Sequence, residues 1–220
     1  INIAKKFADI IHTTNPEAMV MLREDGLINL QQFSAIGIGC GLGTQTTSEQ
    51  LLEEVIATYN QPIVFDADAL NILSVRRELW KQIPLKSVLT PHPKEFDRLF
   101  GNCENDFERI QKALQYSIEL GVVIVLKSHY TLIAYKGKGY FNTTGNVGLA
   151  KGGSVDVLTG IITSLIAQGY TSFKAAVVGV YLHGLAADLA LENQSIESLL
   201  ARDVINYIGR AYNYIKENEE

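Results

Sequence analysis

The sequence has no excess of positive charge and only two cysteines. Its 220 residues carry a formal net charge of −5, so the composition gives no electrostatic support for a nucleic acid or an anionic membrane as a partner. Cys40 and Cys103 stand in unrelated contexts and show neither disulfide pairing nor the spacing of a metal site. We therefore predict a cytoplasmic protein without a metal site built from its own side chains.

The chain also lacks an uninterrupted membrane-length apolar run. The most apolar stretch, residues 173–191, contains Lys174, His183 and Asp188, which favours a buried helix over a membrane span. We expect no signal peptide. The first residue is Ile1 and not Met, so we expect the numbered chain to be a piece of a longer protein.

Short apolar runs alternate with helical patterns along the chain. Strands are predicted at 18–22, 35–39, 62–66, 88–90 and 122–126, with a hairpin at 130–135 and 139–141. Helices are predicted at 2–11, after Thr46 or Thr47, after Asp68, at 95–99, at 107–118 and from 154 onward. This alternation, without repeats or linkers, predicts a single α/β domain with helices on both sides of a mostly parallel sheet.

Polar or glycine-rich loops follow four of these strands, at residues 39–43, 66–68, 90–95 and 127–131. Ligands of open α/β sheets bind beyond the carboxyl ends of the strands, so we expect these loops to converge on one crevice. For each loop a structural role competes with a functional one. The glycines at 39–43 suit either close approach to a ligand or a tight turn, and the acids at 66–68 suit a ligand or a helix cap.

Two side chains in these loops are candidate ligand contacts. His92 stands between two prolines, which restrict its backbone, so a polar ligand contact is favoured over core filling. Lys127 ends an apolar strand, where its ammonium can meet a phosphate or a carboxylate. His183, inside an apolar helix, is interpreted as a core residue with a satisfied partner.

The stretch at 142–153 contains four glycines and leads to Asp156, in the predicted first turn of a helix. Backbone N–H groups of a first turn have no partner inside the helix and suit a phosphate. We predict that Asp156 accepts a proton or holds a metal while these amides hold phosphate. The alternative is an N-cap acid, but a cap does not require the preceding glycines.

Several sequence blocks together resemble the ADP/ATP-dependent NAD(P)H-hydrate dehydratases of the ribokinase-like superfamily. The blocks are PEAMV (16–20), GCGLG (39–43), DADAL (66–70), LTPHPKEF (89–96), VLKSHYT (125–131), TGN (144–146), AKGGSVDVLTG (150–160) and VYLHGLA (180–186). They occur in family order over most of the chain. Each block is weak alone, but the set is specific.

The resemblance implies a three-layer α/β/α fold and repair of hydrated NADH or NADPH, with ADP or ATP and Mg²⁺. The nucleotide phosphorylates the ring hydroxyl, and phosphate then leaves. By motif position, Asp156 is the catalytic base and also contacts the hydrated dinucleotide, together with Gly41 and His92. The adenine nucleotide is lined by Lys127, Ser128, His129, Tyr130, Thr131 and Val155. The expected partners include an NAD(P)H-hydrate epimerase, fused or separate, and further copies of the chain in a homo-oligomer.

The chain departs from the family pattern in two places that bear on function. The family has glycine where this chain has Val155. A β-branched residue there is strained if the turn needs positive φ, and otherwise crowds the phosphate, so we hypothesise weakened turnover. The family also has several dozen residues before the block at 16–20, so we expect this chain to lack its N-terminal segment.

Two other functions fit part of the pattern. A small-molecule kinase of the same superfamily would use the glycine-rich stretch and Asp156 equally well, although the block around His92 favours the dehydratase. A non-catalytic homologue that binds nucleotide is suggested by Val155. The choices between ADP and ATP, and between NADH and NADPH hydrate, stay open.

Overall fold

The computed structural model describes residues 1–25 and 29–218, and the chain divides into two compact units, Ile1–Gln32 and Phe33–Glu220. In the first unit, β1 (Asn2–Ile3) pairs in parallel with β2 (Met21–Leu22). Its helical segments are η1 (Lys5–Phe7), α1 (Ala8–Thr14), η2 (Arg23–Asp25) and η3 (Leu30–Gln32). The helix predicted at 2–11 is thus wrong in its first turn, where the extended backbone of β1 pairs with β2.

The second unit is built on a six-stranded sheet with the order β3-β4-β5-β6-β7-β8. The strands are β3 (Ile36–Ile38), β4 (Ile63–Phe65), β5 (Val88–Leu89), β6 (Val123–Leu126), β7 (Leu132–Tyr135) and β8 (Lys138–Phe141). The first four are parallel, and the hairpin β7–β8 adds two antiparallel strands at one edge. The mostly parallel sheet and the hairpin agree with the prediction from the sequence.

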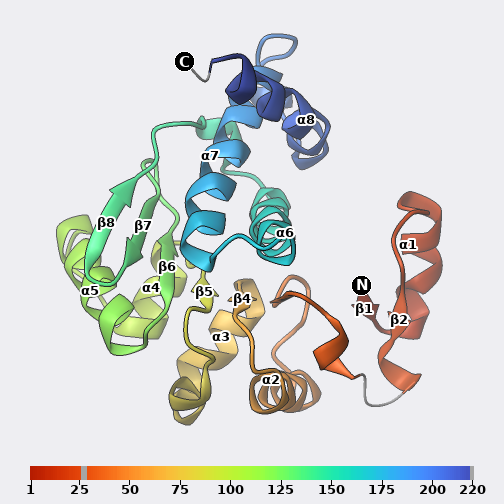
Figure 1. The fold of residues 1–220 in the computed structure, drawn as a ribbon, viewed down its shortest axis with the longest axis vertical. Helices are drawn as coiled ribbons and strands as arrows, with labels where there is room; N and C mark the ends of the chain where they lie inside the picture. The colour runs from red at the N-terminus through yellow and green to blue at the C-terminus, as the bar shows by residue number, and fades with distance from the viewer. Residues whose placement is uncertain (26–28, 219–220) are drawn as a thin grey trace. The chain divides into compact units, whose positions relative to one another are not determined.

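Helices cover both faces of this sheet (Figure 1). The helical segments of this unit are α2 (Thr46–Thr58), α3 (Ala67–Val75), η4 (Arg77–Gln82), α4 (Pro93–Phe100), α5 (Asp106–Glu119), η5 (Val147–Leu149), α6 (Ser154–Ala167), α7 (Ser172–Ala190), η6 (Ile196–Ser198) and α8 (Ala201–Glu217), of which α8 packs on α7 and α6. On one face, Val64, Val88, Val123 and Val125 pack against residues of α6 and α7. The alternate strand residues, such as Phe65 and Ile124, are also buried, so the sheet is the middle of three layers.

Helix α7 is the one helix of the described residues that is long and apolar enough to cross a membrane. Two thirds of its apolar window is buried inside the protein (67%), and α7 lies between the sheet, α6 and α8 in Figure 1. The prediction of a buried helix at 173–191 is therefore confirmed. Core packing accounts for its apolar composition.

Two details of the predicted helices are wrong. In α5 the helical spacing of Phe107 and Ile118 predicts that both lie on the buried face, but they are 70% and 63% exposed, whereas Ala113 and Ser117 are fully buried. The helix packs against β6, β7 and β8, and Ala113 and Ser117 are its fully buried residues. In α2, Gln45 and not a threonine occupies the N-cap position.

Candidate active site

The four strand-end loops meet at the carboxyl edge of the parallel strands. The amide of Asp68 donates to the Gly39 carbonyl, and the amide of Lys127 donates to the Pro91 carbonyl at 2.9 Å. The side chain of Lys127 crosses from β6 to Asp66 at the end of β4. These contacts bring the loops together as the sequence predicts.

Asp66 lies where these loops meet and is completely buried. Its Oδ1 accepts hydrogen bonds from the Ala67 amide (2.8 Å) and from Lys127 Nζ (2.9 Å). Its Oδ2 accepts one from Thr159 Oγ1 at 2.5 Å. Asp66 is therefore the N-cap of α3 and also an internal ion-pair partner. Of the two roles considered for it, a ligand contact or a helix cap, the structure shows the cap.

Asp68 does not cap α3, which corrects the prediction that this helix begins after it. Its Oδ2 instead accepts from the Gly43 amide at 2.8 Å and holds the loop at 39–43. Gly39 has φ +130°, and a Cβ there would lie 1.8 Å from the Asp66 carbonyl oxygen, so only glycine fits. At Gly41, with φ +61°, a Cβ would meet nothing within 4 Å. The loop is a braced turn with open space beside Gly41.

The His92 ring is fixed at the start of α4. Its Nδ1 accepts from the amides of Lys94 (3.1 Å) and Glu95 (3.3 Å), while a Glu95 carboxylate oxygen accepts from the His92 amide. This is a capping box, in which Glu95 is the third helical residue and does not open the helix. Burial lowers the pKa of His92 below its ordinary value, although the Glu95 carboxylate opposes this. A neutral ring that accepts at Nδ1 carries its proton on Nε2, where it can donate to a ligand.

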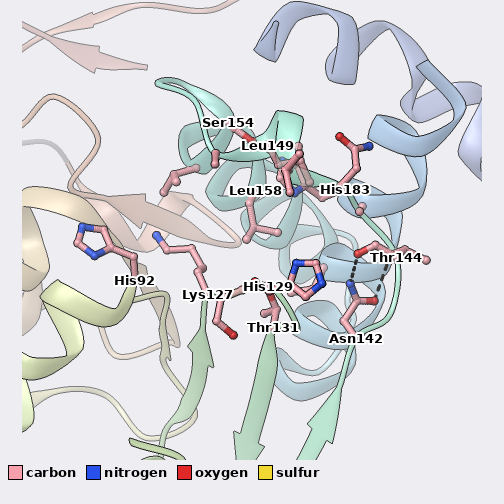
Figure 2. Close-up of a pocket in the computed structure, with 18 residues that line it drawn as sticks. His92, Lys127, His129, Thr131, Asn142, Thr144, Leu149, Ser154, Leu158 and His183 are labelled. Atoms are coloured by element: carbon pink, nitrogen blue, oxygen red, sulfur yellow. Dashed lines mark hydrogen bonds between the residues drawn. The ribbon is translucent and has the colours of Figure 1, made fainter. Parts of the chain in front are cut away.

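Lys127 lies between two carboxylates. Its Nζ is 2.9 Å from Asp66 Oδ1 and 3.8 Å from Glu95 Oε2, and the side chain is 12% exposed. The sequence allowed either a phosphate or a carboxylate as the partner of the Lys127 ammonium, and in the structure its partners are carboxylates. The ammonium also lines a cavity (Figure 2), so one side of it faces the space where a ligand would lie.

Helix α6 begins with three backbone amides that no helical carbonyl can reach, those of Ser154, Val155 and Asp156. Gly153, with φ +85°, precedes them, and no side chain caps this helix. Asp156 lies in the first turn, as predicted, and its side chain is exposed. The free amides and the positive end of the helix dipole favour an anion at this turn.

Val155 is an ordinary residue of the α6 helix, and its φ is not positive. The strain considered for this position is therefore absent, because the left-handed residue is Gly153. The side chain of Val155 is half-buried and lines the cavity. Of the two reasons given for weakened turnover, only crowding of a bound phosphate by the Val155 side chain remains.

Two further contacts surround the first turn of α6. Ser154 Oγ lies 3.2 Å from His183 Nε2, and burial lowers the pKa of His183 to about 4, so this core histidine is neutral and has a partner, as predicted. Loss of hydration, together with the Asp156 carboxylate and the charge of Asp66, raises the pKa of the Cys40 thiol to about 12. The protonated thiol is thus a donor beside Asp156.

A cavity of about 460 Å³ opens next to this turn (Figure 2). It is lined by six of the candidate residues, His92, Lys127, Ser128, His129, Thr131 and Val155. Gly41, Tyr130 and Asp156 do not line it; Tyr130 is 57% exposed, and Asp156 lies beside Cys40. The candidate residues therefore fall into two groups, those that line the cavity and those near Cys40, and the adjacent residues Val155 and Asp156 belong to one group each.

A family model described as NAD(P)H-hydrate dehydratase matches residues 1–210 of the chain. The chain belongs to this family. It is 41% identical over 187 residues to the ADP-dependent (S)-NAD(P)H-hydrate dehydratase of Neisseria meningitidis, and the matched region covers 82% of this chain and 63% of the relative. It is 35% identical over 226 residues to a bifunctional NAD(P)H-hydrate repair enzyme of Moorella thermoacetica, and the matched region covers 99% of this chain and 43% of the relative.

Among solved structures, the chain matches the ADP/ATP-dependent NAD(P)H-hydrate dehydratase of Bacillus subtilis, co-crystallised with ATP/Mg²⁺. The TM-score is 0.83 at 31% identity, over 96% of this chain and 76% of the other. The match confirms the predicted three-layer, ribokinase-like fold. The chain spans less than two thirds of the length of the two curated relatives.

The candidate site includes one clamp that the sequence did not reveal. Asp188 of α7 accepts from the Gly145 amide (2.7 Å) and from Asn146 Nδ2 (2.8 Å). Thr144 Oγ1 donates to the Tyr181 carbonyl of the same helix at 2.9 Å. These bonds fix the loop that forms one wall of the cavity. The Thr-Gly-Asn block pointed to the loop, but nothing local pointed to Asp188, more than forty residues away.

Lys151 precedes the glycines of the predicted phosphate-binding turn, so the sequence suggests it as a cation for the transferred group, but in the structure it is not available for phosphate. Its Nζ donates to the carbonyls of Ile196 (3.1 Å), Glu197 (2.6 Å) and Leu199 (3.0 Å). Three acceptors use all the donors of an ammonium group. Lys151 therefore ties the loop before α6 to the segment before α8.

Proposed function

We propose that the chain dehydrates hydrated NADH or NADPH at the expense of ADP or ATP. The observation that carries this proposal is the position of Asp156. It is an exposed carboxylate in the first turn of α6, next to amides without a helical partner and directly after Val155, which lines a cavity of about 460 Å³. An acid and an anion site in this arrangement suit transfer of a phosphoryl group to a hydroxyl.

In the first step the ring hydroxyl oxygen attacks the terminal phosphorus of the nucleotide. The bond from this phosphorus to the bridging oxygen breaks, and AMP leaves from ADP, or ADP from ATP. Asp156 accepts the hydroxyl proton. The amides at the start of α6 stabilise the negative charge on the phosphoryl oxygens as it spreads.

In the second step the new carbon–oxygen bond breaks and inorganic phosphate leaves with the bonding electrons. The neighbouring ring carbon loses a proton, and the double bond of the dihydronicotinamide forms again. Phosphate is a much better leaving group than hydroxide, which explains why the reaction needs a nucleotide.

The candidate residues divide between the two ligands. Gly41 and His92 are proposed to contact the hydrated dinucleotide, with His92 Nε2–H as a donor. Lys127 through Thr131 and Val155 are proposed to contact the adenine nucleotide; Lys127, Ser128, His129, Thr131 and Val155 line the cavity. Tyr130 is assigned on its sequence position and backbone, because its side chain points elsewhere.

Magnesium would enter this site with the nucleotide. No cluster of three or more His, Cys, Asp or Glu side chains suited to a metal occurs among residues 1–25 and 29–218. Mg²⁺ commonly keeps several waters and binds substrate phosphates. The nucleotide phosphates and water would supply its ligands, and the ion would neutralise phosphate charge. We also propose an epimerase, fused or separate, as a functional partner, because relatives include bifunctional repair enzymes; assembly into a homo-oligomer is a further expectation.

A non-catalytic nucleotide-binding protein is the second candidate, because Val155 lines the cavity next to the amides. One panel separates the candidates. The protein is incubated with ADP or ATP and either hydrated NADH, hydrated NADPH or alcohols such as sugars and vitamin precursors, and phosphate and nucleotide products are measured. We expect turnover of the hydrates alone. Turnover of the alcohols alone would indicate a kinase, and nucleotide binding without any turnover would indicate the non-catalytic protein.

A further inference from the structure

Asp66 connects three elements of the site at its buried centre. It binds the start of α3 through the Ala67 amide, the end of β6 through Lys127, and α6 through Thr159. All three donors reach a carboxylate with no exposed surface. A buried ion pair contributes little net stability compared with well-packed apolar side chains, so fold stability alone does not account for this arrangement.

Thr159 lies three residues after Asp156 on α6. Residues three apart are neighbours on a helix, so a bond that anchors Thr159 also restrains the rotation of α6 and with it the face from which the exposed Asp156 projects. Asp156, Thr159 and Asp66 all influence the pKa of the Cys40 thiol, which places the three side chains in the neighbourhood of this residue.

The ion pair of Asp66 with Lys127 links Asp66 to the cavity. Lys127 is held by Asp66 at 2.9 Å and lines the cavity together with His92 and Val155. The same carboxylate therefore fixes a residue on the nucleotide side and the helix that carries the acid on the substrate side. Movement of α6 relative to β6 would break one of these bonds.

We propose that Asp66 is the positioning residue of the site and that the Thr159–Asp66 hydrogen bond sets the orientation of Asp156 for proton transfer. This inference rests on the proposed dehydratase function. Asp66 itself touches neither ligand. It acts through Thr159 on the reacting hydroxyl and through Lys127 on the nucleotide.

The test removes the Thr159 hydroxyl while keeping the shape of the side chain. Thr159→Val is compared with Thr159→Ser, which restores the hydroxyl, and with Thr163→Val. Thr163 is the matched control, because it lies one turn further along α6 and its hydroxyl donates to the Thr159 carbonyl and not to Asp66. We expect Thr159→Val to lower kcat about 10- to 100-fold, since small misplacements of reacting groups have effects of this size. KM for the nucleotide should stay within about twofold because the cavity wall is intact.

A second measurement does not depend on activity. The amides at 157–160 are the first in α6 that bond to carbonyls of the preceding helical turn. Their hydrogen exchange should become faster in Thr159→Val and stay unchanged in Thr163→Val. If the unmodified protein does not turn over any hydrate, the proposed function fails, and exchange alone still decides the positioning role. If Thr159→Val does not fold, Thr159→Ala takes its place.

Three results would overturn the proposal. One is an unchanged kcat together with unchanged exchange in Thr159→Val. Another is an equal loss in Thr163→Val, which would indicate general damage to α6. The third is failure of Thr159→Ser to recover most of the lost kcat, because the restored hydroxyl again donates to Asp66.

Discussion

Replacement of Val155 by glycine is predicted to increase turnover. The side chain at this position is half-buried and lines the cavity at the start of α6. The Cβ of a helical residue tilts toward the N-terminus of its helix, so the two methyl groups of Val155 lie beside the free amides. We predict that a phosphate that approaches the amide hydrogens from the cavity meets these methyl groups.

The size of the gain follows from the hydrogen bonds that the substitution makes accessible. One hydrogen bond between a backbone amide and a charged phosphate is worth about 1.5–3 kcal/mol. If Val155→Gly allows one such bond in the transition state, kcat/KM rises about 10- to 100-fold. Val155→Ala, which removes the methyl groups and keeps a good helix former, should give an intermediate gain.

The same substitution lowers stability. Loss of a half-buried valine side chain costs about 1 kcal/mol, and glycine in a helix costs about 0.5 kcal/mol more than valine. The unfolding free energy should therefore fall by about 1.5 kcal/mol, which corresponds to a Tm decrease of about 3–6 °C. Activity and stability change in opposite directions, so a general improvement of the protein cannot be mistaken for the predicted effect.

The assay measures phosphate release from hydrated NADH with ADP and with ATP, alongside calorimetric nucleotide affinity, for the unmodified protein, Val155→Ala and Val155→Gly. Equal kcat/KM and equal affinity in all three proteins would refute the reasoning, because they would show that the isopropyl group does not limit access to the amides.

Two other predictions concern the braces around the cavity. Burial lowers the pKa of His183 to about 4 in the folded protein, so the unfolded chain takes up a proton first as the pH falls through about 6.5, and stability should decrease between about pH 6.5 and 4 by at most about 3 kcal/mol. Urea unfolding across this range should show the decrease, and His183→Gln should remove most of it; the same pH dependence in both proteins would contradict this. Asp188→Ala removes the acceptor for two donors of the cavity loop and should weaken nucleotide binding about tenfold with a smaller effect on KM for the hydrate. Unchanged nucleotide affinity by calorimetry would show that the clamp does not support the cavity.

The sequence predicts those parts of the site that depend on local patterns. The glycines before Asp156 and the apolar run after it place this residue in a first helical turn, and the structure agrees. The continuous apolar run that forms β6 likewise predicts a strand buried on both faces. In both cases the signal comes from neighbouring residues.

The sequence does not predict the partners that long-range contacts choose. Asp66 and Asp68 are both plausible caps for α3, and only the fold shows that Asp66 caps the helix while Asp68 binds the loop at 39–43. Lys151 stands in a phosphate-binding block, yet its ammonium is used by carbonyls more than forty residues away. Such choices depend on which backbone groups the folded chain brings within reach.

The most direct test of the central claim is a product balance for the unmodified protein and Asp156→Asn. Purified hydrated NADH is mixed with a limiting amount of ADP, and NADH, AMP and phosphate are measured over time. We predict one AMP and one phosphate for each NADH formed, and a decrease of about 100-fold or more in rate for Asp156→Asn, because amide nitrogen cannot take the hydroxyl proton. Formation of NADH at the same rate in both proteins, or without release of AMP, would contradict the account.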